Sequence, residues 1–281
     1  MEYRHIEVPT NFTEDRWVVG GEIRPGDRAV VHHVIVYEQD PPGTERAPAG
    51  LQIKLPPADP NQPPPTAQQQ QRRQRGPRGW VLVGAGAGEQ VTMFPPGTGK
   101  RVKAGSKLIF QIHYTTNGKA TTDRTSVALQ FAKETPEYEL RTVGVSNPRF
   151  LIPPGEANYR VDSAAEFTED AIVWGVFPHM HVRGKSFDYR MVGPDGRSEP
   201  LLSVPRYDFG WQTSYVFQQP LKVAKGSRME CTAFFDNSTN NKFNPDPTKE
   251  VKWGDQTWEE MMIGWMDYSV ANQRVVRTAS R

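Results

Sequence analysis

The sequence predicts an all-β protein whose antiparallel strands form a sandwich or a barrel. The 24 glycines and 25 prolines among its 281 residues are spread along the chain, and prolines at that density break long helices. Short runs rich in Val, Ile, Phe, Tyr and Thr lie between these turn residues, which is typical of many short strands. No stretch shows the apolar periodicity of an amphipathic helix of three turns.

Strand candidates run through both halves of the chain. Each combines β-branched or aromatic side chains with neighbouring turn signals, which favours a strand over a helix. In chain order, the candidates are Ala29–Tyr37, Lys107–Tyr114, Thr125–Ala132, Ala171–Phe177, Lys185–Val192, Thr213–Phe217, Arg228–Phe235 and Met261–Val270.

A domain boundary is expected within Val145–Gly155, where two proline-containing turns separate two strand-rich halves. We therefore expect an N-terminal domain over residues 1–147 and a C-terminal domain over residues 148–281. The segment 56–79 is rich in Pro, Gln and Arg and cannot bury enough apolar surface to pack, so it is predicted to be a mobile surface insertion.

Charge and hydropathy exclude several classes of partner. Lys and Arg number 34 against 32 acidic residues, which gives no electrostatic basis for binding nucleic acid. No apolar run approaches the roughly 18 residues that a spanning helix needs, so we expect no membrane span. The first residues, MEYRHIEVPT, lack the pattern of a signal peptide. Cys231 is the single cysteine, so no disulfide within the chain is possible.

The histidines are the strongest chemical signal. Of the six in the chain, five fall in three short motifs, which are His32-His33, Gln111-x-His113 and His179-x-His181. The sixth, His5, stands alone and is expected to be a surface residue. A single histidine in a strand is usually structural, whereas this clustering predicts that the five bind metal.

The first two motifs place different demands on the backbone. Gln111 and His113 share one face of a strand because side chains alternate with period two. The adjacent pair His32 and His33 would face opposite sides of a regular strand. For both to bind one ion, the chain needs a β-bulge or a strand end at this pair.

The third motif lacks a complete ligand set of its own. In a strand, the side chains of His179 and His181 lie on the same face and could bind one metal ion. A third ligand has to come from elsewhere, and Thr257–Met266 offers both thioethers and carboxylates. Imidazole with thioether suits copper, whereas imidazole with carboxylate suits iron or zinc.

In this order and spacing, the motifs resemble those of the copper type II, ascorbate-dependent monooxygenases, the family of peptidylglycine α-hydroxylating monooxygenase and dopamine β-monooxygenase. The resemblance runs from about Val30 to Tyr268. Besides the histidine motifs it includes the stretch FPPGTGKRVKAGSKLIFQIHY, Ile152–Glu156, Gly184-Lys185 and Glu260-Met261.

The resemblance implies two consecutive antiparallel, jelly-roll-like β-sandwich domains with a cleft between them, each holding one copper ion. It implies that an electron-transfer copper is bound in the first domain, with Gln111 beside its ligands, and an oxygen-activating copper in the second. The implied ligands are His32, His33 and His113 for the first ion and His179, His181 and Met261 for the second.

Departures from the family bear on the substrate. Phe177 stands where the peptide-amidating enzyme has an arginine for the substrate carboxylate, and Trp265 stands where the family has a tyrosine. Both positions are implied to line the substrate cleft, so a small apolar or aromatic organic substrate is favoured over a peptide. Met262 stands where animal members of the family have a cysteine that would pair with Cys231.

The expected function is a copper-dependent monooxygenase that hydroxylates a C–H bond with dioxygen. Its reductant would be ascorbate or a protein electron donor, and the resemblance implies an extracytoplasmic location, periplasmic or secreted. The main alternative is a non-catalytic copper-binding or electron-transfer module. A zinc hydrolase or hydratase and a plain interaction module are further alternatives.

Overall fold

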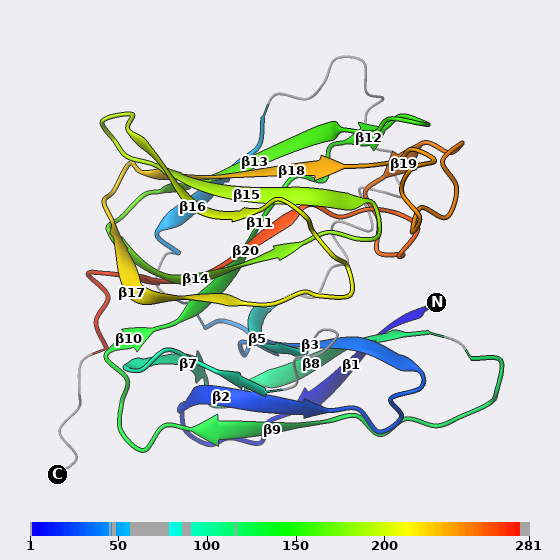
Figure 1. Ribbon diagram of the computed structural model, residues 1–281. Helices are drawn as coiled ribbons and strands as arrows, with labels where there is room; N and C mark the ends of the chain where they lie inside the picture. The colour runs from blue at the N-terminus through cyan, green and yellow to red at the C-terminus, as the bar shows by residue number, and fades with distance from the viewer. Residues whose placement is uncertain are drawn as a thin grey trace, which may run out of the picture. The chain divides into compact units, whose positions relative to one another are not determined.

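The computed structural model describes residues 2–44, 46, 49–56, 79–85, 91–115 and 117–275, and it is all-β over these residues (Figure 1). None of the described residues forms a helix, so none of them offers a long apolar helix of the kind that crosses a bilayer. The strand pairings of known register are antiparallel, apart from the short parallel pairing of β10 with β7. The expectation of an all-β, antiparallel protein is confirmed. Of the expected insertion 56–79, residues 57–78 lie outside the described residues.

The chain divides into two compact units. Unit 1 comprises Met1–Pro48, Pro65–Thr142 and Tyr268–Arg281, and unit 2 comprises Ala49–Pro64 and Val143–Asp267. The predicted domains, 1–147 and 148–281, are each one continuous segment, whereas each unit is built from two or three stretches that are separated in the sequence. Strand pairing is the physical reason. β4 pairs with β13 in unit 2, and Arg274, late in the chain, bridges to Tyr138 in unit 1.

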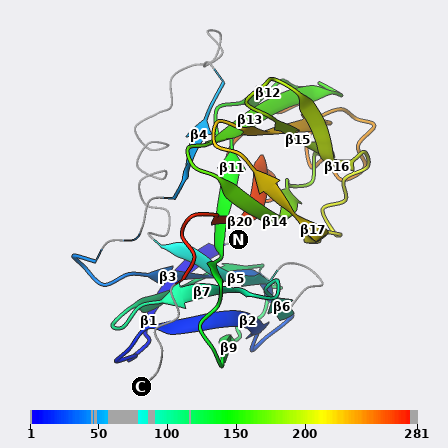
Figure 2. The same ribbon diagram turned by 90° about the vertical axis from the view of Figure 1, so that its left-hand side faces the viewer.

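Unit 1 contains two sheets that lie one above the other (Figures 1 and 2). One has the order β1-β8-β3-β5, and the other has the order β10-β7-β2-β6, with β9 paired to β2. The strands are β1 (Glu2–Pro9), β2 (Arg16–Arg24), β3 (Val31–Gln39), β5 (Trp80–Ala85), β6 (Val91–Met93), β7 (Thr98–Val102), β8 (Lys107–Tyr114), β9 (Ser126–Phe131) and β10 (Tyr138–Glu139).

Unit 2 is also layered. Its larger sheets have the orders β16-β15-β18-β13-β4 and β11-β20-β14-β17, and β12 pairs with β19. The strands of these sheets are β4 (Leu51–Lys54), β11 (Arg141–Ser146), β12 (Leu151–Ile152), β13 (Tyr159–Phe167), β14 (Ala171–His179), β15 (Gly184–Val192), β16 (Ser198–Val204), β17 (Tyr215–Val223), β18 (Arg228–Phe235), β19 (Val251–Lys252) and β20 (Ile263–Val270). Two of them extend into unit 1, to which the first two residues of β11 and the last three of β20 belong.

Alternating burial shows which strand faces form the core. In β18, the side chains of Met229, Cys231, Ala233 and Phe235 are buried, and the residues between them are more exposed. This period of two is that of a strand with one face against a core. Cys231 is therefore a buried core residue, and burial raises the pKa of its thiol well above the ordinary value.

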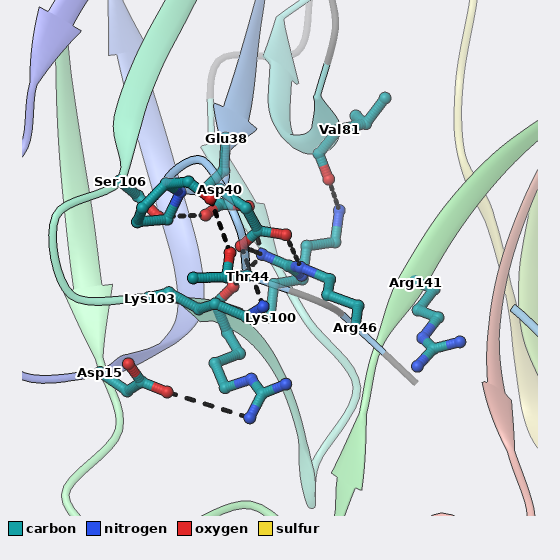
Figure 3. A network of polar contacts seen from close by, with 12 residues as sticks. Asp15, Glu38, Asp40, Thr44, Arg46, Val81, Lys100, Lys103, Ser106 and Arg141 are labelled. Carbon is teal, nitrogen blue, oxygen red and sulfur yellow. Dashed lines mark hydrogen bonds and ion pairs between the residues drawn. The ribbon is translucent and has the colours of Figure 1, made fainter. Parts of the chain in front are cut away.

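A buried ion-pair network joins the ends of β3 and β8 that lie away from the histidines (Figure 3). The guanidinium of Arg46 contacts the carboxylates of Glu38, Asp40 and Glu139, and its side chain is only 7% exposed. Glu38, on β3, also accepts a hydrogen bond from the hydroxyl of Ser106, which directly precedes β8. The network therefore fixes the two strands that carry the first histidine cluster.

Candidate metal centres

Three histidines from neighbouring strands converge in unit 1. β3 and β8 pair with His33 opposite His113, and the register shifts between Val31 and His33. His32 lies within this irregularity, which allows its ring to approach the other two rather than point to the opposite face. The irregularity that the adjacent pair of histidines requires is therefore confirmed.

The three rings are close enough to share one ion. Ring centroids are 5.3 Å apart for His32 and His33, 5.3 Å for His32 and His113, and 4.8 Å for His33 and His113. One nitrogen from each ring lies within 4.8 Å of the others. The Nδ1 atoms of His32 and His33 are 3.1 Å apart, close to the spacing of about 3 Å expected for two nitrogens bound at about 2.0 Å to one ion.

The electrostatics of this cluster favour neutral imidazoles. Burial lowers the pKa of His32, and burial together with the neighbouring His32 lowers the pKa of His113 to about 4. His113 is only 2% exposed. Because a metal binds the neutral ring, these shifts favour the binding form of His32 and His113 at neutral pH.

Gln111 lies on β8 with His113 and on the same face, as expected from its spacing. Its polar contacts are with His5 and Tyr37. Its amide is 3.0 Å from Nε2 of His5, and its carbonyl oxygen is 3.5 Å from the hydroxyl of Tyr37. His5 is opposite Gln111 in the pairing of β1 with β8, so both point to the face that carries His113. His5 is exposed, as predicted, but its position on the face of His113 was not predicted.

Asp123 organises the turn that leads into β3. Its carboxylate accepts hydrogen bonds from the backbone N–H groups of Gly26 and Asp27 and from the hydroxyls of Tyr114 and Thr125. These bonds hold the pKa of Asp123 below its usual value despite partial burial, which acts in the opposite direction. Sequence reasoning missed this residue because its partners are distant along the chain.

A second pair of histidines lies in unit 2. The rings of His179 and His181 have centroids 5.3 Å apart, so both can contact one ion. β14 ends at His179, and His181 lies beyond it in a turn. The prediction that both histidines lie on one strand is therefore wrong for His181, which lies two residues beyond the end of β14. The turn, and not strand periodicity, brings the two rings together.

Hydrogen bonds fix the tautomer of both rings. Nδ1 of His179 is 2.7 Å from Oε1 of Gln212, whose amide nitrogen in turn donates to the carbonyl of Phe209. Nδ1 of His181 is 3.1 Å from the carbonyl oxygen of Glu259. Both partners are acceptors, so each Nδ1 carries the proton and each neutral ring presents the lone pair of Nε2. An orienting acceptor of this kind is usual for a metal-binding histidine.

The segment that contains Met261 is tied to the turn of the second pair. Glu260 is fully buried, and its carboxylate accepts hydrogen bonds from the backbone N–H groups of His181, at 2.8 Å, and Arg183, at 2.6 Å. Burial raises the pKa of Glu260 to about 8, although these N–H groups and the charge of Arg183 oppose the shift. The contacts place Glu259 and Glu260, which directly precede Met261, against the histidine turn.

The two adjacent methionines have different environments. Met262 is 0% exposed, and its sulfur accepts a hydrogen bond from the hydroxyl of Ser163 at 3.3 Å, so it belongs to the core. Met261 is half-buried, immediately follows Glu260 and precedes β20, which begins at Ile263. Of the two, Met261 is the thioether that is not already engaged in the core.

Phe177 and Trp265 lie on strands of one sheet in unit 2. Phe177 is half-buried and stands two residues before His179 on β14, so it shares the face of that histidine. Trp265, on β20, is also half-buried, and its ring lies 3.2 Å from where a Cβ on Gly144 would be. The structure places both in the sheet that carries His179.

Both donor sets fit copper. Unit 1 offers three imidazoles whose nitrogens converge, and unit 2 offers two oriented imidazoles with a thioether next to the segment that holds them. Imidazole binds copper, iron and zinc, and a soft thioether favours Cu(I). A thioether ligand at the second pair would favour Cu(I), whereas the three imidazoles of the first cluster suit copper, iron and zinc alike.

Comparisons with known proteins identify no family for this chain. No protein-family model matches it, and no curated protein matches it. Solved structures that align with it include those of infectious bursal disease virus Gt strain, Gx strain and VP2 subviral particle. Sequence identities are 9%, 8% and 8%, and TM-scores are 0.28, 0.24 and 0.25.

These alignments cover 94%, 92% and 95% of this chain. The chain spans 58%, 57% and 70% of the lengths of these three viral chains. TM-scores this low support no inference about fold or function. The histidine clusters are therefore the features of this chain that point to a function.

Proposed function

We propose that this protein is a copper-dependent monooxygenase that hydroxylates a C–H bond of a small organic substrate, using dioxygen and an external reductant. The observation that carries the proposal is the presence of two separate imidazole clusters, one in each unit, with different donor sets. A family of monooxygenases that uses two uncoupled copper ions has this division of ligands, and the order of the motifs along the chain matches it.

The roles of the protein groups follow from their positions. His32, His33 and His113 would hold the electron-transfer ion, with Gln111 beside them. His179, His181 and Met261 would hold the ion that meets dioxygen. When bound, copper supplies the electron transfer and the activation of dioxygen, while the protein supplies ligands and orientation. Gln212 and Glu259 keep the protons of the second pair on Nδ1.

The proposal extends to fold and substrate. The two units would each be a jelly-roll-like sandwich, and a cleft between them would admit the substrate. Phe177 and Trp265 favour an apolar or aromatic substrate over one with a carboxylate, because neither side chain carries a positive charge to pair with it. The reductant would be ascorbate or a protein donor, and the location would be extracytoplasmic.

A reductant-dependent oxygen-uptake assay tests this function. Protein loaded with copper should consume dioxygen when ascorbate and a panel of small aromatic and aliphatic substrates are present, and mass spectrometry should detect a product that is heavier by one oxygen atom. His179→Ala should abolish product formation while the triad still binds metal.

A non-catalytic copper-binding or electron-transfer module is the second candidate. The observation that favours it is the triad, which is complete within unit 1 and needs no residue from unit 2. Copper that cycles between its two oxidation states without any hydroxylated product would support this function. Selective uptake of zinc from a mixture of metals would instead indicate a zinc protein, because three imidazoles also suit zinc.

A further inference from the structure

Met180, the residue between the two histidines of the second pair, has its backbone N–H and its carbonyl hydrogen-bonded to the same hydroxyl group, that of Tyr207. Met180 is 0% exposed and follows the end of β14, so strand pairing no longer accounts for its backbone groups. The hydroxyl of Tyr207 accepts a hydrogen bond from the N–H of Met180 at 2.9 Å and donates one to its carbonyl at 2.8 Å. Buried backbone groups require such partners.

Tyr207 is itself held firmly. Its backbone N–H donates to the carbonyl of Lys185 at 2.9 Å. Its ring packs against the backbone of Gly184, where an added Cβ would lie 2.7 Å from Cδ1 of the ring. Burial raises the pKa of Tyr207 far above its ordinary value, so the hydroxyl keeps the proton that it donates.

The other backbone groups of the turn have separate partners. Glu260 accepts the N–H groups of His181 and Arg183, and the amide of Asn241 donates to the carbonyl of Val182. None of these bonds reaches Met180. The peptide groups on each side of Met180 set the distance between the two imidazoles. The hydroxyl of Tyr207 binds these two peptide groups, so it constrains that distance.

We propose that Tyr207 is a positioning residue that fixes the spacing and orientation of His179 and His181, so that their Nε2 atoms meet one copper ion. This inference rests on the proposed function of the pair as a copper centre. Tyr207 touches neither the metal nor the substrate. It acts through the backbone of Met180, in the way that outer groups orient metal ligands.

Tyr207→Phe removes one oxygen atom and both hydrogen bonds. The experiment uses the full chain in a His113→Ala background, so that copper is bound at the second centre alone. Cu(I) affinity is measured by competition with a chromophoric Cu(I) chelator, and the Cu(II) spin-resonance spectrum reports the ligand geometry. We expect the Cu(I) affinity to fall about 10- to 100-fold, with an altered spectrum.

Tyr268→Phe is the matched control. Tyr268 is also buried, and its hydroxyl interacts with Arg141; both residues belong to unit 1, whereas the histidine turn belongs to unit 2. This variant should keep the Cu(I) affinity and the spectrum of the second centre. A merely structural loss of one buried hydroxyl should not change the metal geometry, so the spectrum separates positioning from general destabilisation.

Unchanged affinity and spectrum in Tyr207→Phe would overturn the inference while leaving the proposed function intact. The proposed function fails, and the inference with it, if the His113→Ala protein binds no copper. Both fail equally if the copper that it binds remains when His179→Ala is added. Should Tyr207→Phe fold too poorly to titrate, 3,5-difluorotyrosine at position 207 keeps the hydroxyl but weakens it as an acceptor. An unaltered spectrum in that protein would equally contradict the inference, and a shifted spectrum would support it.

Discussion

Replacing Arg46 with methionine should destabilise unit 1 strongly. The substitution keeps an unbranched side chain of similar length but removes the guanidinium from three carboxylates. The loss of the cation costs most at Glu38, because its side chain is only 2% exposed and cannot be solvated instead. The hydroxyl of Ser106 still donates a hydrogen bond to it. Asp40 still has Lys103 at 3.6 Å, and Glu139 still has Arg141 at 3.8 Å.

Breaking a buried ion pair by removing one partner costs about 3–5 kcal/mol. The remaining cations compensate Asp40 and Glu139, so we expect a loss of about 3 kcal/mol at pH 7. Burial raises the pKa of Glu38 even with Arg46 present, and removing the cation raises that pKa further. A carboxyl with a raised pKa in the folded state stabilises the fold at low pH and loses that contribution as pH rises. The destabilisation should therefore be smaller at pH 5 than at pH 7.

Urea denaturation followed by circular dichroism and tryptophan fluorescence measures this effect. Arg24→Met is the matched control, because Arg24 pairs with Glu22 on the surface of the same unit and should leave the midpoint unchanged. Arg46→Met combined with Glu38→Gln should be more stable than Arg46→Met alone, because the uncompensated charge is gone. Equal midpoints for Arg46→Met and Arg24→Met would refute the reasoning.

Three further predictions concern the second centre, the turn before β3 and the core of unit 2. Met261→Ile should weaken Cu(I) binding and remove the copper–sulfur signal from X-ray absorption, whereas Met262→Ile should keep that signal; the reverse result would mean that the ligand is wrong by one residue. Asp123→Asn should cost about 2 kcal/mol at pH 7 through lost charged hydrogen bonds. That difference should shrink as pH falls through the lowered pKa of Asp123, and chemical denaturation at pH 7 and pH 3 measures it. Gly264→Ala would place a Cβ 2.5 Å from the sulfur of Cys231, so thermal melting should show a loss of about 1–3 kcal/mol that Cys231→Ala partly restores.

Strand prediction succeeded where a strand has a continuous apolar face. The expected strands Lys107–Tyr114 and Arg228–Phe235 match β8 and β18 residue for residue, because each has a buried face and a clear turn on either side. The expected strand Thr213–Phe217 corresponds to β17, which runs over Tyr215–Val223. β17 lies at a sheet edge and is largely exposed, so apolar periodicity does not mark where it ends.

The histidine motifs were predictable because their members are close in sequence. The need for an irregular backbone at His32 followed from the period of two in strands, and the structure has a register shift there. The same period misled the interpretation of His179 and His181, because β14 ends before the second histidine. A strand end is set by tertiary contacts, here those of Tyr207 and Glu260, which local spacing does not reveal.

Residues that orient the ligands were not predictable from the sequence. Gln212 lies 33 positions from His179, and Tyr207 lies 27 positions from Met180. No motif links these positions, and each residue type has an ordinary role on a surface or in a core. The pairing of β1 with β8, which brings His5 beside Gln111, was equally hidden, because β1 is an edge strand with mixed polar and apolar residues.

Copper content per chain tests the central claim most directly. Reduced protein is loaded with Cu(I), dialysed and analysed for metal, in parallel with His113→Ala and His179→Ala. We expect two copper ions in the unaltered protein and one in each variant, with the remaining centre spectroscopically unchanged. A single ion in the unaltered protein, or the loss of both ions in either variant, would show that the two clusters are not independent copper centres.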